Sequence, residues 1–128
     1  MSKIISLSGT FKVTQWDEQK ADDNKNTGIV KYAFTSEVNF KGSAVYTFLY
    51  LKQNPGNPME SHSNYNGYLS VELPIDGNHV TVHLKDEGEF VNGKATSVLT
   101  VVGSDKYSGG GSYEASHDES RFELNIVG

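Results

Sequence analysis

The sequence predicts an all-β protein that forms one domain over residues 1–128, an eight-stranded antiparallel up-and-down β-barrel. Stretches in which apolar and polar residues alternate recur along the chain, as expected of strands with one buried face. The dipeptides Asp76-Gly77 and Asn92-Gly93 join successive stretches, and such pairs are the strongest short-range signal of a β-hairpin. No stretch has the periodicity of a helix. Eight strands close most simply into a barrel, which removes exposed sheet edges, and a β-sandwich is the alternative.

The expected strands follow one another with a turn or loop between them. Residues 17–27, 53–63 and 103–112 are rich in charged residues, Pro or Gly, and we expect these three segments to be loops. A further turn is expected near Glu87-Gly88. The alternating or apolar stretches cover residues 5–16, 28–40, 44–51, 65–73, 80–84, 94–102, 113–117 and 121–127.

The charge balance argues against a nucleic-acid partner. The chain has 16 acidic residues against 11 Lys and Arg, and its formal net charge is −5, whereas proteins that neutralise phosphates carry basic patches. An anionic membrane is disfavoured for the same reason, and no run approaches the roughly 18 apolar residues of a membrane-spanning helix. The absence of Cys excludes thiolate chemistry and fits a reducing compartment. We therefore expect a cytoplasmic protein.

Several short motifs recur in an order that resembles a known family. The motifs are Ser8-Gly9-Thr10-Phe11 followed by Trp16-Asp17-Glu18, then Tyr46-x-x-x-Tyr50, Tyr65-x-Gly67, Asp76-Gly77, Leu84-x-x-x-Gly88-x-Phe90 and Gly93-x-Ala95. Together they are similar to the DUF3224 type of small bacterial proteins of unknown function, whose fold is the allene oxide cyclase-like barrel. This resemblance implies a barrel with room for one ligand, similar in plan to cyclases that steer a reactive apolar molecule.

The chain departs from this family pattern at two places. Leu69 stands where such proteins often have a polar residue, and Lys85-Asp86 replaces a Gln-His pair. If these positions line the barrel, this chain has a different cavity from its apparent relatives.

Asp86 is the carboxylate that we single out as a candidate acid or base. It shares strand parity with Val82 and Leu84, so an inward-facing apolar surface would bury its carboxyl group at the end of the cavity. Desolvation raises the pKa of an Asp and suits it to proton transfer near neutral pH. The alternative is that Asp86 belongs to a solvated turn before Gly88.

Aromatic residues are the candidate substrate-binding groups. A phenol packs like an apolar group while its hydroxyl can hydrogen-bond to a carbonyl or a developing oxyanion. The alternative is that these rings only fill the core or an interface. The candidate residues that would contact a substrate are Tyr32, Tyr46, Tyr50, Tyr65, Phe48 and Val82.

No metal or cofactor is expected. His79 and His83 are four residues apart, but on a strand that spacing separates them by roughly 13 Å, which is too far to share an ion. No phosphate-binding loop or nucleophile elbow occurs.

One strand is apolar on both faces, which suggests a partner. Tyr46 and Phe48 share one face, and Val45, Leu49 and Leu51 share the other. The second face must be covered, which favours a homodimer or a larger homo-oligomer.

Three functions therefore stay open. The first is a cofactor-free isomerase or cyclase-like enzyme that binds a small, mostly apolar molecule, with conformational templating supplying much of the catalysis. The second is a non-catalytic, lipocalin-like carrier, and the third is an interaction module with a filled barrel.

Overall fold

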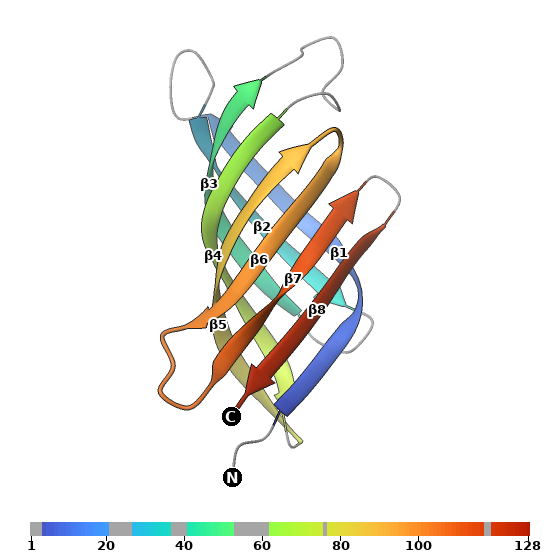
Figure 1. Ribbon diagram of the computed structural model, residues 1–128, viewed down its shortest axis with the longest axis vertical. Helices are drawn as coiled ribbons and strands as arrows, with labels where there is room; N and C mark the ends of the chain where they lie inside the picture. Colours follow the sequence, from blue (N-terminus) through green and yellow to red (C-terminus); the bar gives the residue numbers. More distant parts are fainter. Residues whose placement is uncertain (1–3, 21–26, 37–40, 53–61, 76, 117–118) are drawn as a thin grey trace.

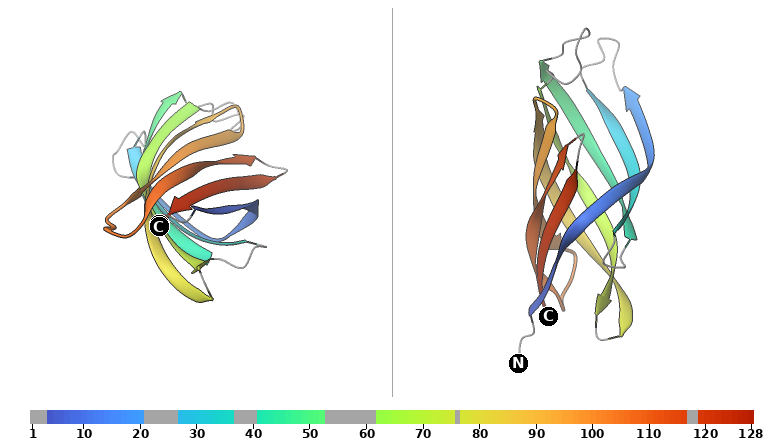
Figure 2. Two further views of the ribbon diagram at one scale, coloured as in Figure 1. Left: turned by 60° about the horizontal axis from the view of Figure 1, so that its bottom comes forward. Right: turned by 90° about the vertical axis from the view of Figure 1, so that its right-hand side faces the viewer.

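The computed structural model describes residues 4–20, 27–36, 41–52, 62–75, 77–116 and 119–128, and these residues form eight strands (Figure 1). Each strand pairs antiparallel with the next one in sequence, and β8 pairs with β1, so the sheet closes into a ring (Figure 2). The strands are β1 (Ile4–Lys20), β2 (Thr27–Ser36), β3 (Lys41–Lys52), β4 (His62–Ile75), β5 (Asn78–Val91), β6 (Lys94–Val102), β7 (Ser108–Ser116) and β8 (Ser120–Val127).

The predicted all-β class, the eight strands and their antiparallel pairing are confirmed. Among the described residues, no helix is long and apolar enough to cross a membrane. Residues 53–61, most of an expected irregular loop, lie outside the described part of the chain.

Two expected breaks in the strands are absent. No turn occurs at Glu87-Gly88, because β5 continues through both residues to Val91 and turns at Asn92-Gly93 instead. The Gly-rich segment is not a loop throughout, since Gly109 to Gly111 belong to β7. A Cβ at Gly110 or Gly111 would overlap a carbonyl oxygen of the adjacent strand, so glycine there allows β7 to pack closely between β6 and β8.

Strand β1 is longer than the sequence predicts, and it changes face near its middle. It continues past Trp16 to Lys20, and its pairing with β2 shifts between Val13 and Gln15. After the shift Trp16 opposes Tyr32, and the two rings stack with centroids 5.7 Å apart. A β-bulge of this kind re-aims the side chains that follow it. The stack places Trp16, which is 55% exposed, beside an interior residue.

The interior of the ring has an apolar part and a polar part. The apolar part lies toward the β4–β5 hairpin at Gly77, where Leu73 and Ile75 are buried. The polar part lies toward the opposite end of β4 and β5 and contains the three buried polar residues among those described, which are Ser63, Asp86 and Ser97. Tyr46, which lies in the same row of the sheet as Asp86, and Tyr113, which is hydrogen-bonded to Asp86, belong to this polar part.

Glycines create room for the aromatic rings of the interior. A Cβ at Gly28, Gly42 or Gly88 would lie only 2.5 to 2.7 Å from a ring carbon on a neighbouring strand. The rings that cover these glycines belong to Phe48, Phe34 and Tyr65, respectively. The closed sheet can therefore hold so many large side chains because the glycines opposite them have no side chain.

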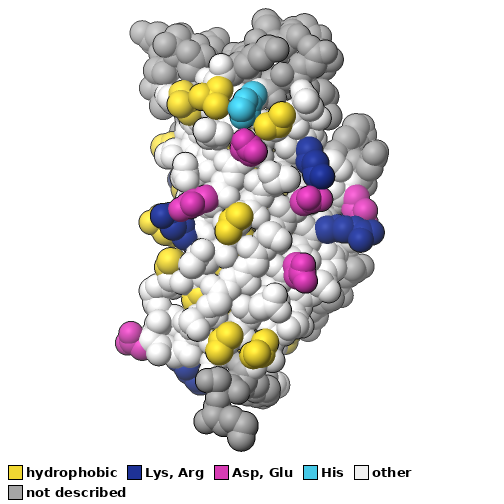
Figure 3. Space-filling model, in the orientation of Figure 1, with side chains coloured by type: hydrophobic (Ala, Val, Ile, Leu, Met, Phe, Trp, Pro, Cys, Tyr) yellow, Lys and Arg dark blue, Asp and Glu magenta, His cyan; other side chains and the backbone are white. Residues whose placement is uncertain are grey.

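The outer surface carries both charged and apolar side chains. On the face toward the viewer in Figure 3, side chains of both charge signs and small groups of apolar side chains are scattered over the surface. On β3 and β4, the outward-facing Val45, Leu49, Leu51 and Tyr68 are each between 44% and 59% exposed. The predicted alternation of β3 is thus confirmed for the isolated chain, with Tyr46 and Phe48 on the buried face.

Candidate functional site

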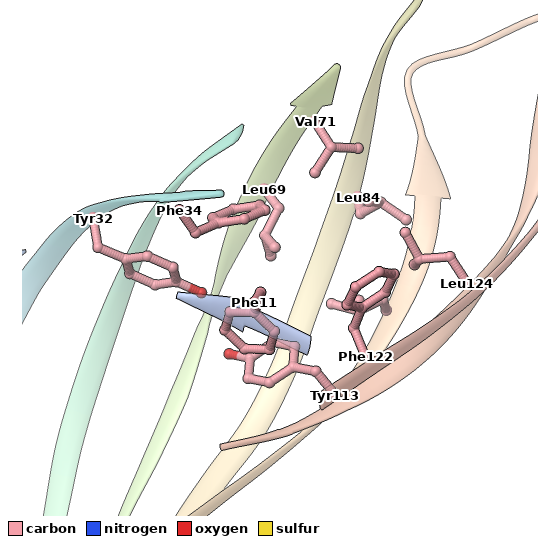
Figure 4. A pocket seen from close by; sticks show the side chains of 10 residues that line it. Phe11, Tyr32, Phe34, Leu69, Val71, Leu84, Tyr113, Phe122 and Leu124 are labelled. Atoms are coloured by element: carbon pink, nitrogen blue, oxygen red, sulfur yellow. The ribbon is translucent and has the colours of Figure 1, made fainter. Parts of the chain in front are cut away.

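A small apolar cavity lies inside the ring (Figure 4). Its volume is about 20 Å³, which is room for about one water molecule. Tyr32 and Tyr113 point their hydroxyl groups to the same side of this cavity (Figure 4). The lining residues are Phe11, Tyr32, Phe34, Leu69, Val71, Leu84, Leu99, Tyr113, Phe122 and Leu124.

Asp86 lies next to this cavity and is fully buried. It follows the cavity residue Leu84 by two positions on β5, and it pairs with the cavity residue Leu99 on β6. Its Oδ2 accepts a hydrogen bond from the hydroxyl of Tyr113 at 3.0 Å. Its Oδ1 has no hydrogen-bond partner among the described residues. A buried carboxylate oxygen without a partner is costly, so its presence needs an explanation, and a catalytic role is one.

Tyr65 and Ser97 form a second hydrogen-bonded pair in the same part of the interior. The hydroxyl of Tyr65 lies 2.5 Å from Oγ of Ser97 and 3.4 Å from the carbonyl oxygen of Thr96. Gly88 allows this approach, because a Cβ there would lie 2.6 Å from the Tyr65 ring. The turn that the sequence suggests at Gly88 is therefore a packing position inside a strand.

Burial changes the acid–base properties of this group of residues. Desolvation raises the pKa of Asp86 to about 6. The Tyr113 hydroxyl, which is bonded to Oδ2, and the nearby Ser97 hydroxyl, whose Oγ is bonded to Tyr65 and not to Oδ1, partly offset the rise. Desolvation also raises the pKa values of Tyr32, Tyr46, Tyr65 and Tyr113. Near neutral pH Asp86, the one buried carboxyl group among the described residues, can therefore change charge, and the phenols around it keep their protons.

Most of the candidate residues face this interior. Tyr32, Tyr46, Tyr65 and Phe48 are buried, and ring contacts join the three tyrosines. Asp86 is buried as its parity predicts, so the solvated-turn alternative is wrong. The remaining two candidates lie farther from the carboxylate.

The two remaining candidates for substrate binding are Tyr50 and Val82. Tyr50 is half-buried and packs edge-on against Phe48, with centroids 5.2 Å apart. Val82 is buried but pairs with Val71, two residues from Leu84 toward the apolar part of the interior. His79 and His83 are exposed, and Nδ1 of His83 lies 2.8 Å from Oγ of Ser70. In the described part of the chain, no three His, Asp or Glu side chains are grouped as metal ligands would be.

Two residues of the site, Ser97 and Tyr113, are missing from the sequence-based candidates. Ser97 has the same parity as Leu99 on β6. A polar residue at an inward position could therefore have identified Ser97 as a site residue, as it did for Asp86. Tyr113 could not be recognised in the same way, because the sequence suggested only a short strand after a Gly-rich loop. The longer β7 places Tyr113 opposite Ser97 and Phe122.

Comparisons with known proteins agree with the motifs. Among solved structures, the chain is similar to the crystal structure of a protein of unknown function of the DUF3224 family from Shewanella oneidensis MR-1. The two chains are 12% identical, with a TM-score of 0.68 over 97% of each. At this identity the likeness shows a shared fold. None of the curated proteins matches the chain. The family model described as "protein of unknown function (DUF3224)" matches residues 7–125, and the chain therefore belongs to the DUF3224 family.

Proposed function

We propose that this protein is a cofactor-free isomerase or cyclase-like enzyme that binds a small, mostly apolar molecule inside the ring. Asp86 is the acid or base of this reaction, and the surrounding tyrosines orient the molecule. The arrangement would follow the allene oxide cyclase-like plan that the motifs imply. As in such enzymes, shape and a few polar groups would guide an apolar substrate.

One observation carries the proposal, namely that Asp86 is fully buried with an unpartnered Oδ1 beside an apolar cavity. Its pKa of about 6 is close to the operating pH that favours general acid–base catalysis. A filled interaction module and a carrier of apolar ligands gain nothing from an unpartnered buried carboxyl, which lowers stability. The carboxyl therefore favours the catalytic function over these two alternatives.

The cavity must expand before a substrate fits, since its volume is about 20 Å³. Phe11 is a side chain whose movement would enlarge it. Its ring lies edge-on to Tyr113 with centroids 5.6 Å apart, and it is only half-buried. Binding would then replace contacts between aromatic rings by contacts with the substrate.

The experiment is a titration of the isotope-labelled protein with small apolar molecules, followed by NMR. We expect shifts at Leu69, Leu99 and Tyr113, which line the cavity, and tighter binding by a Phe11→Ala variant. The matched control is Ile5→Ala, because Ile5 is also partly buried on β1 but is not a cavity residue. An absence of interior shifts in both the wild-type protein and Phe11→Ala would contradict the proposal.

A further inference from the structure

Tyr46 and Asp86 occupy one row of the sheet, on either side of a glycine. Gly67 on β4 pairs with Tyr46 on β3 and with Asp86 on β5. Both side chains point to the interior, and Gly67 places no side chain between them. Strands are spaced by roughly 4.8 Å, so the two Cα atoms are about 10 Å apart along this row. Such a separation lets a phenol and a carboxylate contact opposite ends of one small molecule.

These two groups also have hydrogen-bonding capacity left. Oδ1 of Asp86 has no partner in the described part of the chain. The contacts seen for Tyr46 are made by its ring, with Tyr32 and Tyr65 at centroid distances of 5.7 and 4.9 Å. The neighbouring hydroxyls are already engaged, since Tyr113 donates to Asp86 and Tyr65 is bonded to Ser97.

Burial, and then the neighbouring Tyr32, Tyr65 and Asp86, raise the pKa of Tyr46. The Tyr46 hydroxyl therefore stays protonated near neutral pH and can act as a hydrogen-bond donor. A neutral donor next to a basic carboxylate is the combination that enolisation of a carbonyl compound requires, because negative charge develops on the carbonyl oxygen while a proton leaves the adjacent carbon.

We propose that the substrate is a carbonyl compound with an acidic C–H group next to the carbonyl, and that Asp86 and Tyr46 catalyse its isomerisation through an enolate. This inference rests on the proposed function and specifies its substrate class. It also assigns Tyr46 as the group that stabilises the oxyanion.

The step conserves atoms and electrons without a co-reactant. Oδ1 of Asp86 takes the proton from the α-carbon, and the C–H electron pair becomes a C=C bond. The carbonyl π pair moves to oxygen, and the resulting oxyanion accepts a hydrogen bond from the Tyr46 hydroxyl. Asp86 then returns the proton to the same carbon or, in a β,γ-unsaturated ketone, to the γ-carbon. The second outcome moves the double bond into conjugation.

The test measures hydrogen–deuterium exchange of small cyclic ketones, saturated and β,γ-unsaturated, by proton NMR in deuterium oxide. Binding of the same ketones is measured separately by saturation-transfer NMR. We expect the wild-type protein to accelerate α-exchange at least about a hundredfold over Asp86→Asn, as is typical for removal of a general base. We expect Tyr46→Phe to slow exchange by about a hundredfold with little change in binding, as found when one oxyanion donor is removed. Tyr68→Phe is the control, since Tyr68 is exposed on the outer face.

A pH profile tests the inference without any variant. The exchange rate should rise with pH, reach half of its maximum at about pH 6, and level off roughly one pH unit higher, as Asp86 becomes a carboxylate. The tyrosines around Asp86 keep their protons across this range, so they add no second inflection.

The outcomes separate this inference from the proposed function. If ketones bind but exchange no faster than with Asp86→Asn, the enolisation step is wrong and binding inside the ring survives. If molecules without a carbonyl bind and no ketone does, the substrate class is wrong. If nothing binds, both the inference and the proposed function fail.

Discussion

The hydroxyl of Tyr113 on β7 donates a hydrogen bond to Oδ2 of Asp86 on β5 across 3.0 Å. Strand β6 separates these two strands in the sheet, so the bond passes over the inner side of β6. Because Tyr113 also lines the cavity, this bond connects the apolar cavity to the buried carboxyl group. A ligand that displaces the Tyr113 ring would therefore also affect the acidity of Asp86.

The first prediction follows from this bond. The Tyr113 hydroxyl lowers the pKa of Asp86, so Tyr113→Phe should raise that pKa above about 6. Carbon-13 NMR of the Asp86 carboxyl measures the effect. Tyr107→Phe is the control, because it also removes a phenol hydroxyl but Tyr107 does not contribute to the pKa shift of Asp86. The Tyr107 ring instead lies under Nζ of Lys106, 5.4 Å from the ring centroid. A pKa that stays the same or falls in Tyr113→Phe would show that the bond does not act on the carboxylate.

The second prediction concerns stability and pH. Asp86 has a pKa of about 6 in the folded chain, above its ordinary value of 3.8. The folded state therefore holds this proton more tightly, and the free energy of unfolding should fall as pH rises through this interval. Between pH 4.5 and 7.5 the loss should be about 2 kcal/mol.

Urea unfolding of the wild-type protein and of Asp86→Asn at both pH values isolates this loss from that of other carboxyl groups. Glu123→Gln, a change at an exposed residue of β8, should leave the pH dependence of the wild-type protein intact. A difference between the wild-type protein and Asp86→Asn that is the same at both pH values would rule out the burial cost assigned to Asp86.

The third prediction tests the packing of Gly88. A Cβ there would lie 2.5 Å from Oγ of Ser97 and 2.6 Å from the Tyr65 ring. Gly88→Ala should therefore displace both side chains and cost about 1 to 3 kcal/mol of unfolding free energy. Thr81→Ala, at an exposed position of the same strand, should cost less. Equal effects in urea unfolding would mean that Tyr65 moves away without cost.

The fourth prediction is association through the outer face of β3 and β4. Val45, Leu49, Leu51 and Tyr68 form an exposed apolar surface there. We expect light scattering to report a homodimer or larger homo-oligomer, because burying this surface is favourable. Leu49→Lys should shift the protein toward monomer, whereas Val98→Lys on β6 should not. A monomeric wild-type protein at high concentration would contradict the prediction.

The strand pattern and the position of Asp86 could be predicted from the sequence because both follow from local alternation. Once Val82 and Leu84 face inward, parity alone carries Asp86 inside. Asn92-Gly93 also marks a real turn, where Asn92 and Gly93 both have positive φ.

The rest depends on contacts between distant strands. Gly88 and Gly109 to Gly111 resemble turn residues in sequence, but they lie in strands where a neighbouring ring or backbone leaves no room for a side chain. The face of Trp16 depends on a shift in the pairing of β1 and β2. The volume of the cavity depends on how aromatic side chains such as Phe11 pack inside the closed sheet. The alternation of apolar and polar residues does not specify this packing.

The proposed function requires Asp86 to be a buried carboxyl group that changes protonation near neutral pH. The most direct measurement is a carbon-13 NMR titration of this carboxyl group in the wild-type protein, with Asp86→Asn used to assign the signal. We expect a midpoint at about pH 6. A midpoint near the ordinary value of 3.8 would contradict it, because a carboxyl group with that acidity is hydrated or paired and is not available as the proposed base.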